Sequence, residues 1–112
     1  MRYEVLPLPL KNGIALGIHL ELPDTHLIIA TTERGYITCG LLDVTVMDAV
    51  HPERGVVAGR AFGVLSLDDL LEARLRDVTA TARLLGISEG MIGREALELL
   101  LLPADEAQAQ EL

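Results

Sequence analysis

The first half of the chain alternates between apolar and polar residues, which is the pattern of β-strands that bury one face. Turn signals interrupt the alternation at Lys11-Asn12-Gly13, at Pro23-Asp24-Thr25 and at Glu33-Arg34-Gly35. Pro7 and Pro9 lack a backbone N–H, so they mark either an edge strand or the end of the first strand. Because the connections are short, we expect four strands in an antiparallel meander. These strands are predicted over residues 2–8, 14–22, 26–31 and 36–40.

After this meander the apolar residues take up helical spacing. Asp43 can cap a short helix over residues 44–50, which His51-Pro52 ends. A fifth strand is predicted over residues 56–64, although glycines weaken it. Three more helices are predicted, from the capping-box sequence Ser66-Leu67-Asp68-Asp69, from Asp77 to Gly86, and over residues 94–102.

Strands therefore dominate the first half of the chain and helices the second, which favours an α+β fold. We expect an antiparallel or mixed sheet from the N-terminal half, with the helices of the C-terminal half packed on one face. A length of 112 residues predicts a single domain, over residues 1–103. Residues 104–112 have no apolar face and are predicted to be a flexible acidic tail.

The chain is unusually apolar, with 50% hydrophobic residues and a mean hydropathy of +0.36. No segment approaches the roughly 18 uncharged apolar residues that a membrane-spanning helix needs. No apolar signal core follows the N-terminus, so we expect a soluble, cytoplasmic protein without a membrane partner. Segments such as Leu27-Ile28-Ile29-Ala30 are apolar on both faces, and one layer of helices cannot cover both. The surplus apolar surface predicts a homo-oligomer.

The charge and composition of the chain also argue against several classes of partner and site. The net charge is −8, no run of basic residues compensates for it, and aromatic residues are only 3% of the chain. Such a chain repels polyanions and offers no stacking platform, so nucleic acid is not an expected partner. A single cysteine excludes an internal disulfide and a cysteine-cluster metal site.

Two histidines flank the second turn and are the best candidates for metal binding. If Leu22 faces His26 in the hairpin, His19 and His26 point to opposite faces of the sheet, although a slip of one residue would reverse this. The spacings of the known two-histidine metal motifs are absent. No metal site and no cofactor are therefore predicted.

Cys39 has two interpretations. It ends a predicted strand just before a helix, where the thiolate form is favoured, so it could be a reactive thiol supported by Asp43 and Arg60. The alternative is a buried small apolar residue, because no histidine lies in the same motif.

Arg60 is the one cation in the otherwise apolar segment from Val56 to Val64. A buried arginine needs an anionic partner, which is either a small carboxylate or phosphate ligand or an acid of the chain such as Asp43. The candidate ligand-binding residues are Arg60, Asp43, Arg54, Tyr36 and Gly59.

Three segments of the chain carry a resemblance to a known family. They are RGYITCGLLDV at residues 34–44, RGVVAGRAFGV at residues 54–64, and the glycine-punctuated helical segment that ends in GISEGMIGREALELL at residues 86–100. The sequence resembles the YunC-like family, a small bacterial and archaeal domain of unknown function, over roughly residues 14–102. The resemblance implies an α+β fold and oligomerisation, but it supplies no activity.

The sequence leaves two functions open. The first is a homo-oligomeric module that binds a small anionic ligand or a protein partner. The second is an enzyme that uses Cys39 as its reactive thiol. A cavity shared by Cys39 and Arg60 would favour the enzyme.

Overall fold

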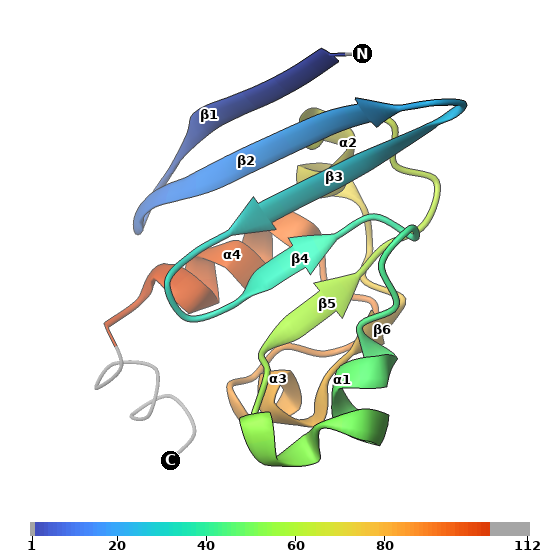
Figure 1. Ribbon diagram of the computed structural model, residues 1–112. Helices are drawn as coiled ribbons and strands as arrows, with labels where there is room; N and C mark the ends of the chain where they lie inside the picture. The colour runs from blue at the N-terminus through green and yellow to red at the C-terminus, as the bar shows by residue number, and fades with distance from the viewer. Residues whose placement is uncertain (1, 104–112) are drawn as a thin grey trace.

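The computed structural model describes residues 2–103 and shows one sheet with helices on both sides (Figure 1). The six strands are β1 (Arg2–Leu10), β2 (Gly13–Leu22), β3 (Thr25–Thr31), β4 (Tyr36–Thr38), β5 (Ala58–Arg60) and β6 (Asp77–Val78). They lie in the order β1-β2-β3-β4-β5-β6. Neighbouring strands are antiparallel except β4 and β5, which are parallel. The α+β fold, the four-strand meander and the edge position of β1 are therefore confirmed.

Short helices connect and follow these strands. They are α1 (Thr45–Val50), the 3₁₀ helix η1 (Pro52–Arg54), α2 (Leu67–Glu72), α3 (Ala80–Leu84) and α4 (Gly93–Leu101). Ser66 caps α2 as predicted, because its hydroxyl accepts the N–H of Asp69 at 3.0 Å. None of the helices within residues 2–103 is long and apolar enough to span a membrane.

One face of the sheet, here called the inner face, packs against α2 and α4. Close approach is possible because small residues lie at the crossings: the side chain of Leu67 lies against Gly17, and Gly93 lies against the carbonyl of Leu70. The core between the two layers is aliphatic and fully buried, with Leu8, Ala15, Ile28, Ala30, Ile37, Leu70, Leu71, Leu97 and Leu100.

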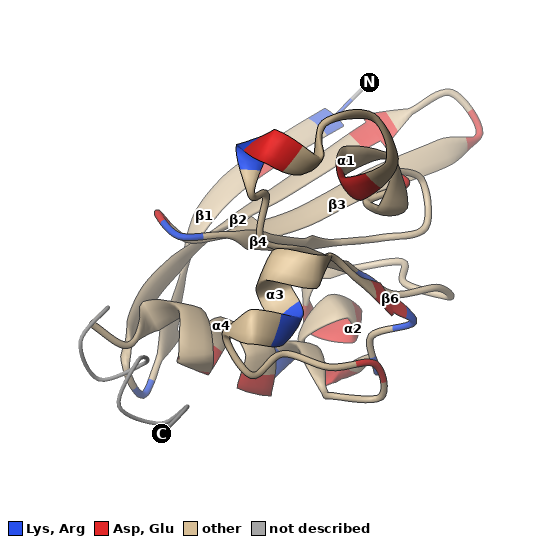
Figure 2. Cartoon of the chain, turned by 90° about the horizontal axis from the view of Figure 1, so that it is seen from below, with Lys and Arg blue, Asp and Glu red and all other residues tan. Residues whose placement is uncertain are grey.

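The opposite face, here called the outer face, is divided into two halves. Over β4, β5 and β6 its side chains are buried or half-buried, and α1 and η1 lie on this side of the sheet, across from α2, α3 and α4 (Figure 2). Thr38, Ala58 and Thr79 are buried in this covered half, each at most 1% exposed. Over β1, β2 and β3 no described helix covers the outer face, and large apolar side chains remain exposed there.

Several sequence-based expectations need correction. The strand predicted over residues 56–64 pairs only at Ala58–Arg60. Asp77 does not start a helix: it belongs to β6, paired with Arg60, and α3 begins at Ala80 with Thr79 as its cap. The N-cap position of α1 is Val44 rather than Asp43, although the Asp43 carboxylate accepts the Thr45 N–H.

The predicted domain boundary stays a prediction. The tail over residues 104–112 lies outside the described residues.

Candidate functional site

The sheet separates the two residues on which the enzyme hypothesis depends. Thr38 pairs with Arg60, so Arg60 shares the outer face with Thr38. Cys39 follows Thr38 in an extended backbone, and successive side chains of a strand point to opposite faces. Cys39 accordingly contacts the inner core, where it is 4% exposed. Arg60 is not among the described residues that line the hollow beside Cys39.

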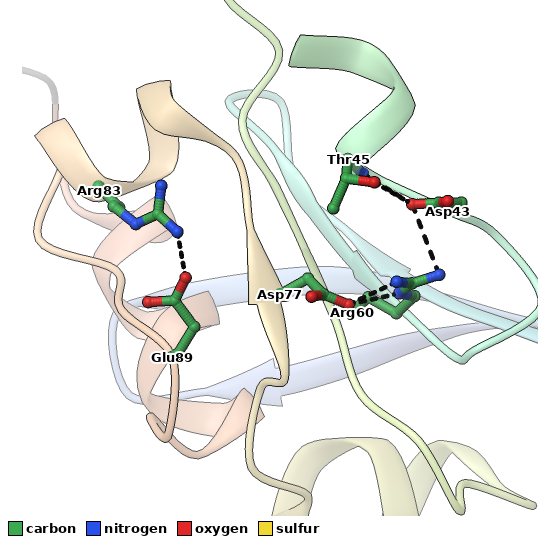
Figure 3. A network of polar contacts seen from close by, with 6 residues as sticks. All are labelled: Asp43, Thr45, Arg60, Asp77, Arg83 and Glu89. Atoms are coloured by element: carbon green, nitrogen blue, oxygen red, sulfur yellow. Dashed lines mark hydrogen bonds and ion pairs between the residues drawn. The ribbon is translucent and has the colours of Figure 1, made fainter. Parts of the chain in front are cut away.

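Arg60 is held by two aspartates at the covered half of the outer face (Figure 3). Its Nε and Nη2 donate to Asp77 Oδ2 at 2.8 and 2.5 Å, and its Nη1 lies 3.5 Å from Asp43 Oδ1. The Arg60 side chain is only 15% exposed, so these partners supply the countercharge that a nearly buried guanidinium requires. The pairing with Asp43, one of the two alternatives left open by the sequence, is present, and Asp77 is the nearer partner.

Asp43 is fixed in place from the start of α1. Its Oδ1 accepts the Thr45 hydroxyl at 2.5 Å and the Thr45 N–H at 3.0 Å. The hydroxyl bond above all, together with the N–H bond and the charge of Arg60, lowers the pKa of Asp43 below its ordinary value. Asp43 is therefore an ionised acceptor that links the start of α1 to Arg60 on β5.

An aromatic ring extends this cluster. The guanidinium carbons of Arg60 and Arg76 lie 4.9 and 5.3 Å from the centre of the Phe62 ring, which suits cation–π contacts. Figure 3 also shows a separate pair, Arg83 with Glu89, which joins α3 to the loop that follows it.

The remaining predicted ligand-binding residues do not join Arg60 in one site. Gly59 faces the inner side, where an added Cβ would lie 2.9 Å from Leu75 Cδ1, so the glycine permits close packing. Tyr36 lies half-buried on β4, and burial raises the pKa of its hydroxyl. Arg54 is exposed at the end of η1. A ligand-binding role for these residues stays a prediction.

Cys39 reaches the floor of a hollow of about 480 Å³ at one end of the sheet. The polar contacts of its sulfur are with the main chain: it accepts the N–H of Ile28 at 3.4 Å and donates to the carbonyl of His26 at 3.6 Å. Among residues 2–103 no lysine or arginine lines the hollow. Its walls are Asp24, Thr25, His26, Cys39, Gly40, Leu41, Gly63, Val64 and Leu65.

The expectation that His19 and His26 point to opposite faces is wrong. The hairpin pairs Leu22 with Thr25 rather than with His26, because a two-residue turn suffices: Asp24 adopts a left-handed φ of 59° after Pro23. The two rings share a face, and His19 Nε2 lies 2.9 Å from His26 Nδ1. Within the described part of the chain, no three histidine, cysteine or acidic side chains are grouped as metal ligands.

The sequence predicted a surplus of apolar surface. It did not predict that this surface lies on the outer face of β1, β2 and β3. The side chains of Tyr3, Val5, Ile14 and Leu16 are 75%, 59%, 67% and 41% exposed. The strand register places all four on the same face. Exposed apolar surfaces of this extent are frequent at contact sites of proteins.

Comparisons with known proteins identify a family of unknown function and a solved structure with the same fold. The family described as Domain of unknown function (DUF1805) matches residues 38–100. Uncharacterized protein YunC of Bacillus subtilis (strain 168) is 44% identical over 91 residues, which cover 81% of this chain and 90% of that protein. A crystal structure of a protein of unknown function from Thermoplasma acidophilum has a TM-score of 0.78 at 23% identity. It covers 87% of this chain and 91% of its own, and shows that the fold is shared.

Proposed function

This chain belongs to the DUF1805 family, and from its geometry we propose that it is a homo-oligomeric binding module rather than an enzyme. The observation that carries the proposal is the large apolar side chains left exposed on a single copy. They are 36–75% exposed and comprise Tyr3, Val5, Ile14, Leu16, Leu41, Leu42, Val46, Val50, Phe62, Leu65 and Leu84. A cytoplasmic location is part of the same proposal, since a lone buried thiol needs no oxidising compartment.

The most direct test of this proposal is the mass of the protein in solution. One chain has a mass of 12.1 kDa, so light scattering after gel filtration at micromolar concentration should give a multiple of that value. A monomer over the whole accessible concentration range would contradict the proposal.

A protein partner fits the described groups better than a small anion. The guanidinium of Arg60 already faces two aspartates, and the hollow beside Cys39 has an acid, Asp24, but no cation in its wall. An anion would have to displace Asp43 from Arg60. We therefore expect inorganic phosphate to leave the melting temperature unchanged. A rise with phosphate that is lost in Arg60→Met would restore the anionic-ligand hypothesis.

The enzyme remains the second candidate because Cys39 and His26 line the same hollow. Against it, the sulfur is 4% exposed and its polar contacts are both main-chain groups, which cannot take up its proton. We expect Cys39 to react with iodoacetamide at neutral pH far more slowly in the native protein than in urea. Equal rates in the two states would favour the enzyme.

A further inference from the structure

We propose that the outer face of β1, β2 and β3 packs against the same face of a second copy of this chain. This inference rests on the proposed function, because it assigns the oligomer to one of the exposed apolar surfaces. The face consists of the odd-numbered residues of β1 and β3 and the even-numbered residues of β2, which the strand register sets side by side. Its apolar members are Tyr3, Val5, Pro7, Pro9, Ile14, Leu16, Ile18, Leu20, Leu22, Leu27 and Ile29.

The distribution of charge supports a second copy as the occupant. The structure describes every residue of β1, β2 and β3, and within these strands no charged residue lies on the outer face. Arg2, Glu4 and Glu21 all share the inner face with His19 and His26, at the end of the hairpins. Two copies that each carry a net charge of −8 repel one another, so a contact between strands that present no carboxylate costs them least.

The two edge strands of the sheet favour an interface between sheet faces over strand pairing between the edges of two copies. β1 is an edge strand, and Pro7 and Pro9 offer no N–H to an added strand. The other edge, β6, is only two residues long. Neither edge suits continuous strand addition, whereas two uncovered sheets can stack about 10 Å apart, as in a sandwich.

The available area suits a stable dimer. An aromatic side chain buries roughly 150–250 Å² when it is covered, and Tyr3 is 75% exposed, with Val5, Ile14 and Leu16 also exposed on the same face. The exposed prolines and the half-buried Ile18, Leu20, Leu27 and Ile29 enlarge the patch. Each partner gives ~800 Å² to an ordinary interface, so the contact would use this whole face rather than a part of it.

The shape of the face is compatible with a two-fold axis. At one end a hollow of about 400 Å³ lies between Pro7, Ile14, Leu16 and Thr31, with Glu33 of the following turn also in its wall. At the other end Tyr3 is the most exposed apolar side chain, at 75%. A two-fold axis through the middle of the face exchanges these ends and sets Tyr3 of each copy over the hollow of the other. A tyrosine in a pocket is a common energetic centre of an interface.

The test compares matched charge insertions by light scattering and sedimentation. Leu16→Glu places a carboxylate on the outer face, whereas Leu65→Glu and Leu84→Glu place one on side chains that are 69% and 70% exposed elsewhere. We expect Leu16→Glu to weaken assembly at least tenfold and both controls to leave it unchanged. Circular dichroism checks that each variant is folded.

A milder variant covers the case in which Leu16→Glu fails to fold. Ile14→Thr keeps a β-branched residue in β2 and removes apolar area, and we expect it to weaken assembly several-fold. If the wild-type protein is a monomer, the proposed function fails together with this inference. If the oligomer persists unchanged in the folded outer-face variants, only the inference is overturned, and loss of the oligomer in Leu65→Glu would place the interface elsewhere.

Discussion

The two halves of the outer face belong to one sheet, but the described part of the chain covers only one of them. Over β4, β5 and β6 the chain returns through α1 and η1, and the polar groups beneath find partners within the same molecule. Over β1, β2 and β3 the face is apolar, and no described helix covers it. One half is therefore stabilised by contacts within the chain, and the other is the half for which we propose a contact with a second copy. Variants in the first should change unfolding, and variants in the second should change assembly.

The largest expected effect is the loss of the Thr79 hydroxyl in the covered half. Thr79 is fully buried, and its Oγ1 accepts the N–H groups of Ala58 and Ala82 at 3.1 and 3.3 Å. Thr79→Val leaves both donors without a partner and removes the cap of α3. We expect the free energy of unfolding to fall by about 2–4 kcal/mol.

Thr79→Ser is the matched control because it keeps the oxygen. Urea unfolding of the two variants and the wild-type protein, all at the same protein concentration, measures the difference. Equal stability of the valine and serine variants would show that these two hydrogen bonds contribute nothing.

The Arg60 cluster should give a smaller loss of stability without a change in assembly. The side chains of Arg60 and Asp77 are 15% and 28% exposed, so solvent partly screens the pair. We expect Arg60→Met to cost about 1–2 kcal/mol. The double variant with Asp77→Asn should lose less than the sum of the single variants, since it leaves neither charge unpaired.

A complete cycle of melting curves, with the oligomer mass recorded for each variant, separates the two halves of the face. Additive losses would mean that the pair is not coupled. Dissociation of the oligomer in Arg60→Met would mean that the covered half also takes part in assembly.

Salt should strengthen the assembly modestly. The strands of the proposed interface place no charge on the outer face, and only Glu33 lies at the rim, while each copy carries −8, so screening reduces repulsion without breaking an ion pair between strands. Raising sodium chloride from about 0.02 to about 0.5 M should tighten the oligomer a few-fold, as measured by sedimentation equilibrium. Dissociation at high salt would indicate an interface held by ion pairs, and would place it elsewhere on the molecule.

The smallest effect concerns acid stability in the covered half. The folded-state pKa of Asp43 is lowered, first by the Thr45 hydroxyl, so its stabilising contribution is full above roughly pH 4 and is lost as the pH falls through the lower folded value. Thr45→Ala should move the pKa of Asp43 up towards its ordinary value in an NMR titration. Thr45→Ser should leave it low, and no difference between the two variants would exclude the hydroxyl as the cause.

The sequence predicts what depends on local signals. Alternation and turns located the first four strands, and Ser66 located the start of α2. The start of α3 was misplaced because Asp77 and Thr79 both suit a cap. The choice between them depends on Arg60, which is distant in sequence and draws Asp77 into β6.

The candidate site shows the same limit. A lone arginine in an apolar segment predicted an anionic partner, either a ligand or an acid of the chain, and the structure places Asp43 and Asp77 beside it. The contact of His19 with His26 depends on the strand register, in which Leu22 pairs with Thr25 and not with His26 as assumed from the sequence. The exposure of one half of the outer face depends on which strands α1 covers, and no local pattern encodes that.

The central claim is that a second copy covers the outer face of β1, β2 and β3. Hydroxyl-radical footprinting with mass spectrometry, at protein concentrations above and below the assembly midpoint, measures this directly on the unmodified chain. We expect Tyr3 and Leu16 to become protected as the protein assembles, while Leu65 and Leu84 are oxidised to the same extent at both concentrations. Unchanged oxidation of Tyr3 and Leu16 in the assembled protein, with protection of Leu65 or Leu84, would contradict the claim.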